Sequence, residues 1–215
     1  MLKCVIFDMD GTIADTFTLC TTSLRSTVEA LTDTTKTNDE ISAQFGLSEE
    51  GILNELVPGK AAEGLEIYHR FYEKLHPALC AKPVDGIIDL IMKIKKLGIN
   101  VALVTGKGDR ALAITLRLFG MEDTFEPIET GKPNNICKAD GITSVLGKLN
   151  LQPEEAVYIG DTAGDIAGSR KAGVQILSAA WAESADIAEL EKNNLGSVFY
   201  SVEEMASFLD SLLLV

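Results

Sequence analysis

Two aspartates near the start of the chain, Asp8 and Asp10, follow a short apolar run at residues 4–7 and precede Gly11. In an extended chain, side chains two positions apart lie on the same side. A glycine directly after them allows the chain to turn sharply. Two carboxylates this close repel each other unless a cation or a proton relieves them. The pair therefore predicts a metal site or an acid/base pair at the carboxyl end of a buried strand.

Other polar residues stand in similar positions further along the chain. Thr105 and Gly106 follow an apolar run at 99–104, Asp161 and Asp165 follow one at 156–159, and Lys138 opens a predicted helix. Taken singly, each has an ordinary structural role, such as a helix cap or a solvated lysine. In an open parallel sheet, however, the carboxyl ends of the strands converge on one crevice. We therefore expect these groups to meet there.

The residue types in that crevice favour phosphate chemistry. Carboxylates without histidine or cysteine suit a hard cation such as Mg²⁺, which binds oxygen ligands and often shares them with a phosphate. A hydroxyl, backbone amides and an ammonium are the partners that the other phosphate oxygens need. A carboxylate nucleophile can divide phosphoryl transfer into two steps through an aspartyl-phosphate.

The elements that must position these groups alternate along most of the chain. Predicted strands lie at 3–7, 99–104, 125–129, 156–159, 174–177 and 197–200. Predicted helices lie at 87–97, 108–119, 142–149 and 184–191; a further helix ends at 172, and the last begins at 202. This alternation predicts an α/β fold, a Rossmann-like parallel sheet with helices on both faces. Residues 16–80 show only helical patterns, at 17–31, 39–45, 48–56 and 60–75. We expect a core domain of residues 1–15 and 82–215 and a small helical cap domain of residues 16–81.

The segments Asp8-Met9-Asp10-Gly11-Thr12, Thr105-Gly106, Lys138 and Gly160-Asp161-Thr162-Ala163-Gly164-Asp165 resemble the four signature motifs of the haloacid dehalogenase (HAD) superfamily. The resemblance extends over essentially the whole chain. It is closest to the branch of phosphoglycolate phosphatases and β-phosphoglucomutases, whose helical cap is inserted just after the first motif. The first and last motifs are specific in this order, whereas the Thr-Gly and Lys motifs are weak alone.

The resemblance implies a role for each matching residue. Asp8 would be the nucleophile, and Asp10 the general acid and then the general base. Lys138 would neutralise charge on the nucleophile and the phosphate. The implied phosphate ligands are Thr105, Gly106 and Lys138, and the implied Mg²⁺ ligands are Asp8, Asp10 (through its carbonyl), Asp161 and Asp165. Lys132, in Gly131-Lys132-Pro133, also matches the third motif, but we prefer Lys138 because it directly opens a helix.

The predicted cap holds the residues expected to choose the substrate. The loop Phe45-Gly46-Leu47-Ser48 resembles the cap loop that approaches the substrate, so Gly46 and Leu47 are candidate contacts; a simple turn between helices is the alternative. The aromatic and histidine residues of the third cap helix, which include Tyr68, His69 and His76, suit packing better than a site. Trp181 follows a predicted strand and suits partial burial, although it could rim the pocket.

Composition limits the partners. With a net charge of −13, the chain offers no basic surface for nucleic acid. Its four cysteines form no CxxC pair, no signal peptide is recognisable and no apolar stretch could span a membrane, so we expect a cytoplasmic protein. We expect a monomer or a weak homodimer that acts on a small phosphorylated metabolite: phosphoglycolate, a sugar phosphate, a nucleotide or pyrophosphate. A phosphosugar mutase and a non-catalytic binding protein remain alternatives, whereas a dehalogenase and a phosphonatase are disfavoured.

Overall fold

A parallel sheet forms the centre of the computed structural model, which describes residues 1–134 and 138–213. Its six strands follow the order β3-β2-β1-β4-β5-β6, and each pairs in parallel with its neighbours. The strands are β1 (Cys4–Phe7), β2 (Asn100–Val104), β3 (Ile128–Glu129), β4 (Ala156–Gly160), β5 (Gln175–Ala179) and β6 (Val198–Phe199). The residues of β1 and β4 are all buried, as expected for strands covered on both faces.

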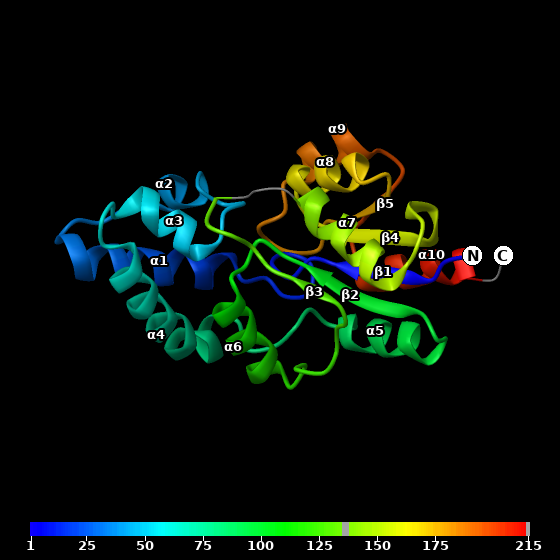
Figure 1. Ribbon diagram of the computed structural model, residues 1–215, viewed down its shortest axis with the longest axis horizontal. Coiled ribbons are helices and arrows are strands. Elements are labelled where there is room, and N and C mark those ends of the chain that lie inside the picture. The colour runs from blue at the N-terminus through cyan, green and yellow to red at the C-terminus, as the bar shows by residue number, and fades with distance from the viewer. Residues whose placement is uncertain (135–137, 214–215) are drawn as a thin grey trace.

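Helices cover both faces of the sheet (Figure 1). One face carries α5 (Ile87–Lys96), α6 (Asp109–Phe119) and α10 (Val202–Leu213), and the other carries α7 (Lys138–Leu149), α8 (Ala163–Lys171) and α9 (Ile187–Asn194). Successive strand residues point to opposite faces, so Phe7 joins the first core and Ile6 the second. A short 3₁₀ helix, Pro153–Glu155, leads into β4. The predicted α/β fold with helices on both faces is confirmed.

Four further helices pack together beyond the carboxyl ends of the strands, at the end of the molecule opposite both chain termini (Figure 1). They are α1 (Phe17–Thr32), α2 (Asn38–Ser42), α3 (Glu49–Leu56) and α4 (Ala61–Leu79), and we call them the four-helix segment. Their apolar core includes Leu24, Leu53 and Tyr68, and it also contacts Ala111 and Ile114 of α6. This all-helical insert is consistent with a cap, whereas the domain boundaries at 15/16 and 81/82 stay a prediction.

Several elements differ from their predicted extent. The helix predicted to end near residue 75 continues to Leu79, although Pro77 removes one backbone donor from its last turn. The buried stripe of Tyr68, Tyr72 and His76, at steps of four residues, continues into that turn and explains the extension. The strand predicted at 125–129 is reduced to β3; Phe125, which precedes it, is buried in the core that α5, α6 and α10 cover.

The remaining expectations concern single residues and the membrane. Trp181 is partly buried against the core, and its Nε1 donates a hydrogen bond to the carbonyl of Thr12 at 3.0 Å. Cys4, Cys20 and Cys80 are free thiols, while Cys137 lies outside the described residues. Within the described part of the chain, every helix falls short of the length and apolarity needed to cross a bilayer.

Candidate active site

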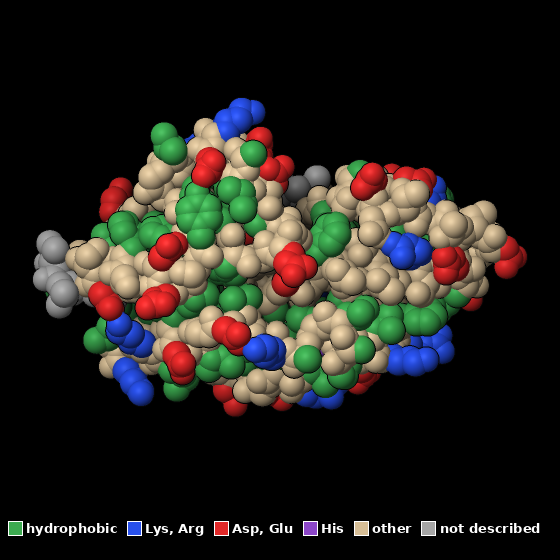
Figure 2. Space-filling view, turned by 180° about the vertical axis from the view of Figure 1, so that it is seen from behind, with side chains coloured by type: hydrophobic (Ala, Val, Ile, Leu, Met, Phe, Trp, Pro, Cys, Tyr) green, Lys and Arg blue, Asp and Glu red, His purple; other side chains and the backbone are tan. Residues whose placement is uncertain are grey.

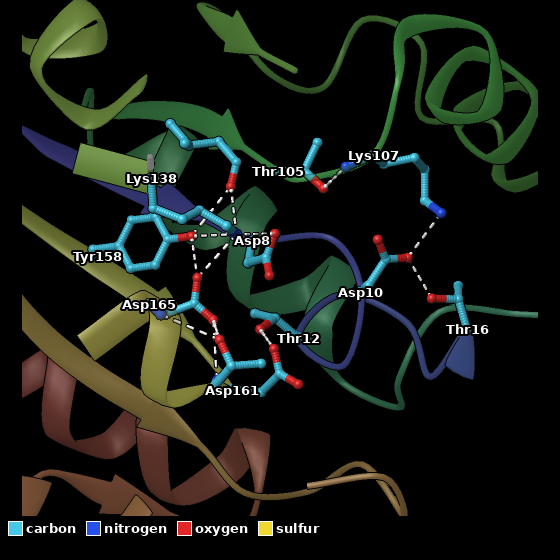
Figure 3. A network of polar contacts seen from close by, with 12 residues as sticks. Asp8, Asp10, Thr12, Thr16, Thr105, Lys107, Lys138, Tyr158, Asp161 and Asp165 are labelled. Carbon is cyan, nitrogen blue, oxygen red and sulfur yellow. Dashed lines mark hydrogen bonds and ion pairs between the residues drawn. The ribbon is translucent and has the colours of Figure 1, made fainter. Parts of the chain in front are cut away.

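Three buried carboxylates meet at the carboxyl edge of the sheet (Figure 3). Asp8 directly follows β1, Asp161 directly follows β4, and Asp165 lies in the first turn of α8. One oxygen from each lies within 4.8 Å of the others. Gly11 has a φ of +76°, and a Cβ there would lie 1.9 Å from Asp161 Oδ2, so only glycine permits this approach. The turn after β1 and the end of β4 together therefore bring the acids into one cluster.

Burial and mutual repulsion raise the pKa of two of these acids, Asp8 and Asp161. Burial, reinforced by Asp165 and opposed by Lys138, raises the pKa of Asp8 to about 7. Burial and the charges of Asp165 and Asp8 also raise the pKa of Asp161 well above its usual range. Asp8 Oδ1 is buried and is paired with the Lys138 ammonium. Three buried carboxylates beside one ammonium leave an excess of negative charge, which fits a hard divalent cation such as Mg²⁺.

Lys138 is the cation that the protein itself places in this cluster. Its Nζ lies 2.7 Å from Asp8 Oδ1 and 2.9 Å from Asp165 Oδ1. Burial disfavours the ammonium, but the carboxylates of Asp165 and Asp8 outweigh burial and raise the pKa of Lys138. Lys132 is exposed, and no ion pair with Asp8 is recorded for it among the described residues. The structure therefore brings Lys138, the preferred of the two lysines, to the predicted nucleophile.

Asp165 is held rigidly from several sides. It accepts hydrogen bonds from the Tyr158 hydroxyl at 2.9 Å and from the Thr162 amide and hydroxyl at 3.0 and 2.6 Å. Burial would raise its pKa, but Lys138 and the Thr162 hydrogen bonds lower it instead. The Tyr158 hydroxyl also lies 2.9 Å from Lys138 Nζ. Tyr158, in the middle of β4, was not among the predicted site residues, since an aromatic residue in a buried strand suggests only packing.

Thr105 and Gly106 lie at the end of β2, on the other side of Asp8. Thr105 is buried, and its Oγ accepts a hydrogen bond from the Lys107 amide at 3.1 Å. A Cβ at Gly131 would lie 1.7 Å from the Gly106 carbonyl oxygen, so glycine at 131 allows the two loops to touch. A Cβ at Gly106 would lie 3.6 Å from the Gly46 carbonyl oxygen. Gly46 of the predicted cap loop thus reaches the predicted phosphate loop, and Leu47 follows it.

The side chain of Asp10 turns away from Asp8, toward the four-helix segment (Figure 3). Its Oδ1 accepts a hydrogen bond from Thr16 Oγ and lies 3.0 Å from Lys107 Nζ. The structure therefore brings together Asp8, Lys138, Asp161 and Asp165, with Thr105 and Gly106 beside them. The carboxylate of Asp10 instead forms a second, adjacent cluster.

Lys107 is the part of this second cluster that sequence reasoning missed. Its side chain is 1% exposed, and Nζ lies 4.0 Å from Glu49 Oε1, 3.6 Å from Cys20 Sγ and 4.8 Å from the centre of the Tyr72 ring. These partners come from α3, α1 and α4. Glu49 also accepts a hydrogen bond from the Gly108 amide at 2.7 Å. A lysine after a Thr-Gly turn usually suggests a solvated charge, and its burial here depends on helices distant in sequence.

A cavity of about 570 Å³ connects the two clusters and extends under the four-helix segment. Asp8, Asp10, Lys107, Lys138 and Asp161 all line it. Its remaining walls include Phe45, Gly46 and Leu47 of the predicted cap loop and Thr162 at the start of α8. A small molecule in this cavity would therefore contact the carboxylate cluster and the four-helix segment together.

An α/β sheet with these acids, a threonine and a lysine at its carboxyl edge defines a class of enzyme that works in a crevice above the strands. The chain belongs to the haloacid dehalogenase-like hydrolases, whose family model matches residues 5–179. The family is one of hydrolases, so the chain is an enzyme of that class.

Individual relatives agree with this assignment. A PpaX protein of Clostridium perfringens (strain 13 / Type A) is 28% identical over 178 residues, which cover 81% of this chain and 82% of the relative. The pyrophosphatase PpaX of Bacillus cereus (strain 03BB102) is 24% identical over 182 residues, covering 84% of each chain. The solved structure of CbbY from Rhodobacter sphaeroides in complex with phosphate superposes with a TM-score of 0.77 at 20% identity. That likeness covers 94% of this chain and 95% of CbbY and shows the shared fold.

Proposed function

We propose that the protein is an Mg²⁺-dependent phosphatase that hydrolyses a small phosphorylated metabolite through an aspartyl-phosphate on Asp8. The observation that supports this most is the position of the Asp8 carboxylate, between the Lys138 ammonium and the acids Asp161 and Asp165. A carboxylate so placed can attack phosphorus while neighbouring positive charge offsets the charge of the phosphoryl group. The nearby Thr105 hydroxyl and Gly106 amide supply hydrogen-bond donors for the phosphoryl oxygens.

In this proposal the residues of the chain divide the reaction into two proton-coupled steps. Asp8 attacks phosphorus, and Asp10 gives a proton to the departing oxygen. Asp10 then accepts a proton from the water that hydrolyses the aspartyl-phosphate. Lys138 favours the ionised form of Asp8, which burial disfavours, and would contact the phosphate. Asp8, Asp161, Asp165 and the Asp10 carbonyl would hold Mg²⁺, which would supply positive charge to offset the charge of the phosphoryl group.

Release of phosphate from p-nitrophenyl phosphate, with and without Mg²⁺, tests the proposal. We expect turnover only with Mg²⁺, and a loss of more than about 10³-fold in Asp8→Asn, which removes the nucleophile. Lys138→Ala should lose most activity, while Lys132→Ala, a matched change at the exposed lysine, should keep it. Metal-independent turnover, or an Asp8→Asn variant as active as the parent, would contradict the proposal. A collapse in Lys132→Ala alone would instead assign the third motif to Lys132.

Assays with a panel of phosphorylated metabolites would identify the substrate class. The relatives named as pyrophosphatases make pyrophosphate a candidate, beside phosphoglycolate, sugar phosphates and nucleotides. We propose that residues 16–81 form a cap that chooses among them, because the four-helix segment lines the cavity. Isomerisation rather than hydrolysis of β-glucose 1-phosphate would favour a phosphosugar mutase. Binding without turnover of any compound would favour a non-catalytic protein.

Other parts of the proposal concern partners and location. On the face shown in Figure 2, Asp and Glu side chains are dispersed among Lys and Arg, and the described residues form no broad basic patch there. This supports a small-molecule substrate rather than a nucleic acid. The monomeric or weakly dimeric state and the cytoplasmic location remain predictions, which light scattering and cell fractionation can test.

A further inference from the structure

The end of the cavity away from Asp8 has an apolar wall. It is built from the four-helix segment and the loop between α2 and α3, and it consists of Phe17, Leu24, Phe45, Leu47 and Ile52. In a phosphatase, this end holds the leaving group, because the phosphoryl group itself must lie against Asp8. Apolar walls favour a leaving group with a carbon surface, because contact removes that surface from water.

The charges in the cavity disfavour a second anionic group on the substrate. The cations among its described lining residues are Lys107 and Lys138, and each already lies beside two carboxylates. The lining also includes a further acid, Asp186. A carboxylate or a second phosphate on the leaving group would lose hydration there without gaining a free cation.

One polar group in this apolar end lacks a partner. Tyr68, on α4, lines the cavity and is completely buried, yet its hydroxyl makes no hydrogen bond in the described structure. Burial, helped by the nearby Cys20 and Glu49, raises the pKa of Tyr68, so its hydroxyl stays protonated and can donate. The neighbouring Tyr72 differs, because its hydroxyl is paired with Thr115 Oγ at 2.8 Å. A buried hydroxyl left unpaired is costly, and a ligand oxygen would relieve that cost.

From these observations we infer that the substrate is a phosphate monoester of an uncharged alcohol, with an apolar carbon skeleton and one hydroxyl or carbonyl that pairs with Tyr68. The inference rests on the proposed phosphatase function. It assigns Tyr68 as a residue that determines specificity. It also sets this chain apart from the relatives named as pyrophosphatases, because pyrophosphate has an anionic leaving group and no carbon skeleton.

Steady-state kinetics with Mg²⁺ on a matched substrate series tests this inference. The series consists of n-alkyl phosphates, the corresponding ω-hydroxyalkyl phosphates, phosphoglycolate and pyrophosphate. We expect kcat/KM to rise with alkyl length, to rise further with the terminal hydroxyl at one chain length, and to be at least about tenfold lower for both anionic compounds.

Tyr68→Phe isolates the hydroxyl. We expect it to lower kcat/KM about tenfold for the preferred hydroxyalkyl phosphate and much less for the matched alkyl phosphate, while circular dichroism verifies folding. Tyr200→Phe makes the same change at an exposed tyrosine and should alter neither.

Three outcomes would overturn the inference in different ways. Mg²⁺-dependent turnover that favours pyrophosphate or phosphoglycolate would overturn the substrate class while leaving the phosphatase function intact. Equal effects of Tyr68→Phe on hydroxyalkyl and alkyl phosphates would overturn the role of Tyr68. No phosphate release from any ester, including p-nitrophenyl phosphate, would overturn the proposed function and the inference with it.

Discussion

At the scale of single residues, the acid/base candidate is linked to the four-helix segment through one lysine. Lys107 holds Asp10 on the side of the cavity that we propose for the leaving group, and its other contacts come from three helices of that segment. Burial disfavours the ammonium, but its partners, Asp10 foremost, outweigh burial and raise the pKa of Lys107 well above its ordinary value. Lys107 therefore stays charged and can act as a positioning residue for Asp10.

Lys107→Met should change kcat/KM by different amounts for different substrates, according to whether the leaving group must be protonated. For alkyl phosphates, whose leaving oxygen must be protonated, we expect kcat/KM to fall about 10²-fold, because Asp10 loses its orientation. For p-nitrophenyl phosphate, whose leaving group departs without a proton, we expect little change. The measurement is kcat/KM, which includes steps up to formation of the aspartyl-phosphate.

Two companion variants control this experiment. Lys107→Met leaves Glu49 buried without its ion pair, so adding Glu49→Gln should restore stability but not the lost alkyl-phosphate activity. Lys74→Met, the same change at an exposed lysine of α4, should alter neither property. Equal losses on alkyl and aryl phosphates would show that Lys107 has only a structural role.

The candidate site could be predicted from sequence wherever a residue follows a strand closely. Asp8, Thr105 and Asp161 lie directly after buried strands, so the position of the strand also places the side chain. Lys107 and Tyr68 could not be assigned in this way. Their surroundings come from helices distant in the sequence, and no spacing within one element shows which groups those helices will bring together.

At the scale of elements, the start of α8 serves both structure and the site. Thr162 is the N-cap residue, and its hydroxyl accepts a hydrogen bond from the Asp165 amide at 3.1 Å while Asp165 bonds back to the Thr162 amide. This reciprocal capping box satisfies backbone donors that the first turn of a helix leaves unpaired. The Asp165 carboxylate also faces Lys138, so the capping box at the start of α8 orients a predicted metal ligand as well.

Thr162→Ala should therefore lower the free energy of unfolding by about 1 kcal/mol, the usual cost of losing an N-cap side chain. Thr162→Ser keeps the hydroxyl and should lose much less. Urea denaturation of the three proteins, without added metal, measures the difference. Equal stability of the alanine and serine variants would show that the hydroxyl contributes nothing to α8.

The ends of elements were harder to predict than their existence. The alternation of strand and helix patterns predicted the parallel sheet correctly, because each pattern has its own periodicity. The extension of α4 through Pro77 was missed, because it depends on burying His76 between Tyr72 and Phe119. Phe119 belongs to α6, so the contact that extends α4 is a tertiary one.

At the scale of the whole molecule, the contacts between the four-helix segment and the rest of the fold could not be predicted from sequence patterns. Alternating elements predict a parallel sheet but not the order in which its strands pair. The insertion of four helices after β1 places them beyond the carboxyl ends of the strands, as Figure 1 shows. Both histidines of the chain lie in α4, where this segment packs against α6.

These two histidines should make the stability of the molecule depend on pH. Burial lowers the pKa of both below the ordinary value of 6.5, helped by Arg110 for His69 and by Lys107 for His76. In the unfolded chain each would take up a proton as the pH falls below 6.5, whereas in the folded protein each stays neutral further down. Stability is therefore fully present above pH 6.5 and falls as the pH drops toward the lowered pKa values, by at most about 1.4 kcal/mol per pH unit for each histidine.

His76→Phe isolates this effect, because it keeps an aromatic ring between Tyr72 and Phe119 but cannot titrate. Between pH 6.5 and pH 5, we expect its free energy of unfolding to fall less steeply than that of the parent. The difference in slope should be at most about 1.4 kcal/mol per pH unit, the value for one proton. Adding His69→Phe removes the last histidine and should flatten the curve further. Carboxylates titrate alike in all three proteins, so the differences between their urea-unfolding curves belong to the histidines. Parallel curves would mean that both histidines titrate as freely in the folded protein as in the unfolded chain, and that α4 is open to water where it packs against α6.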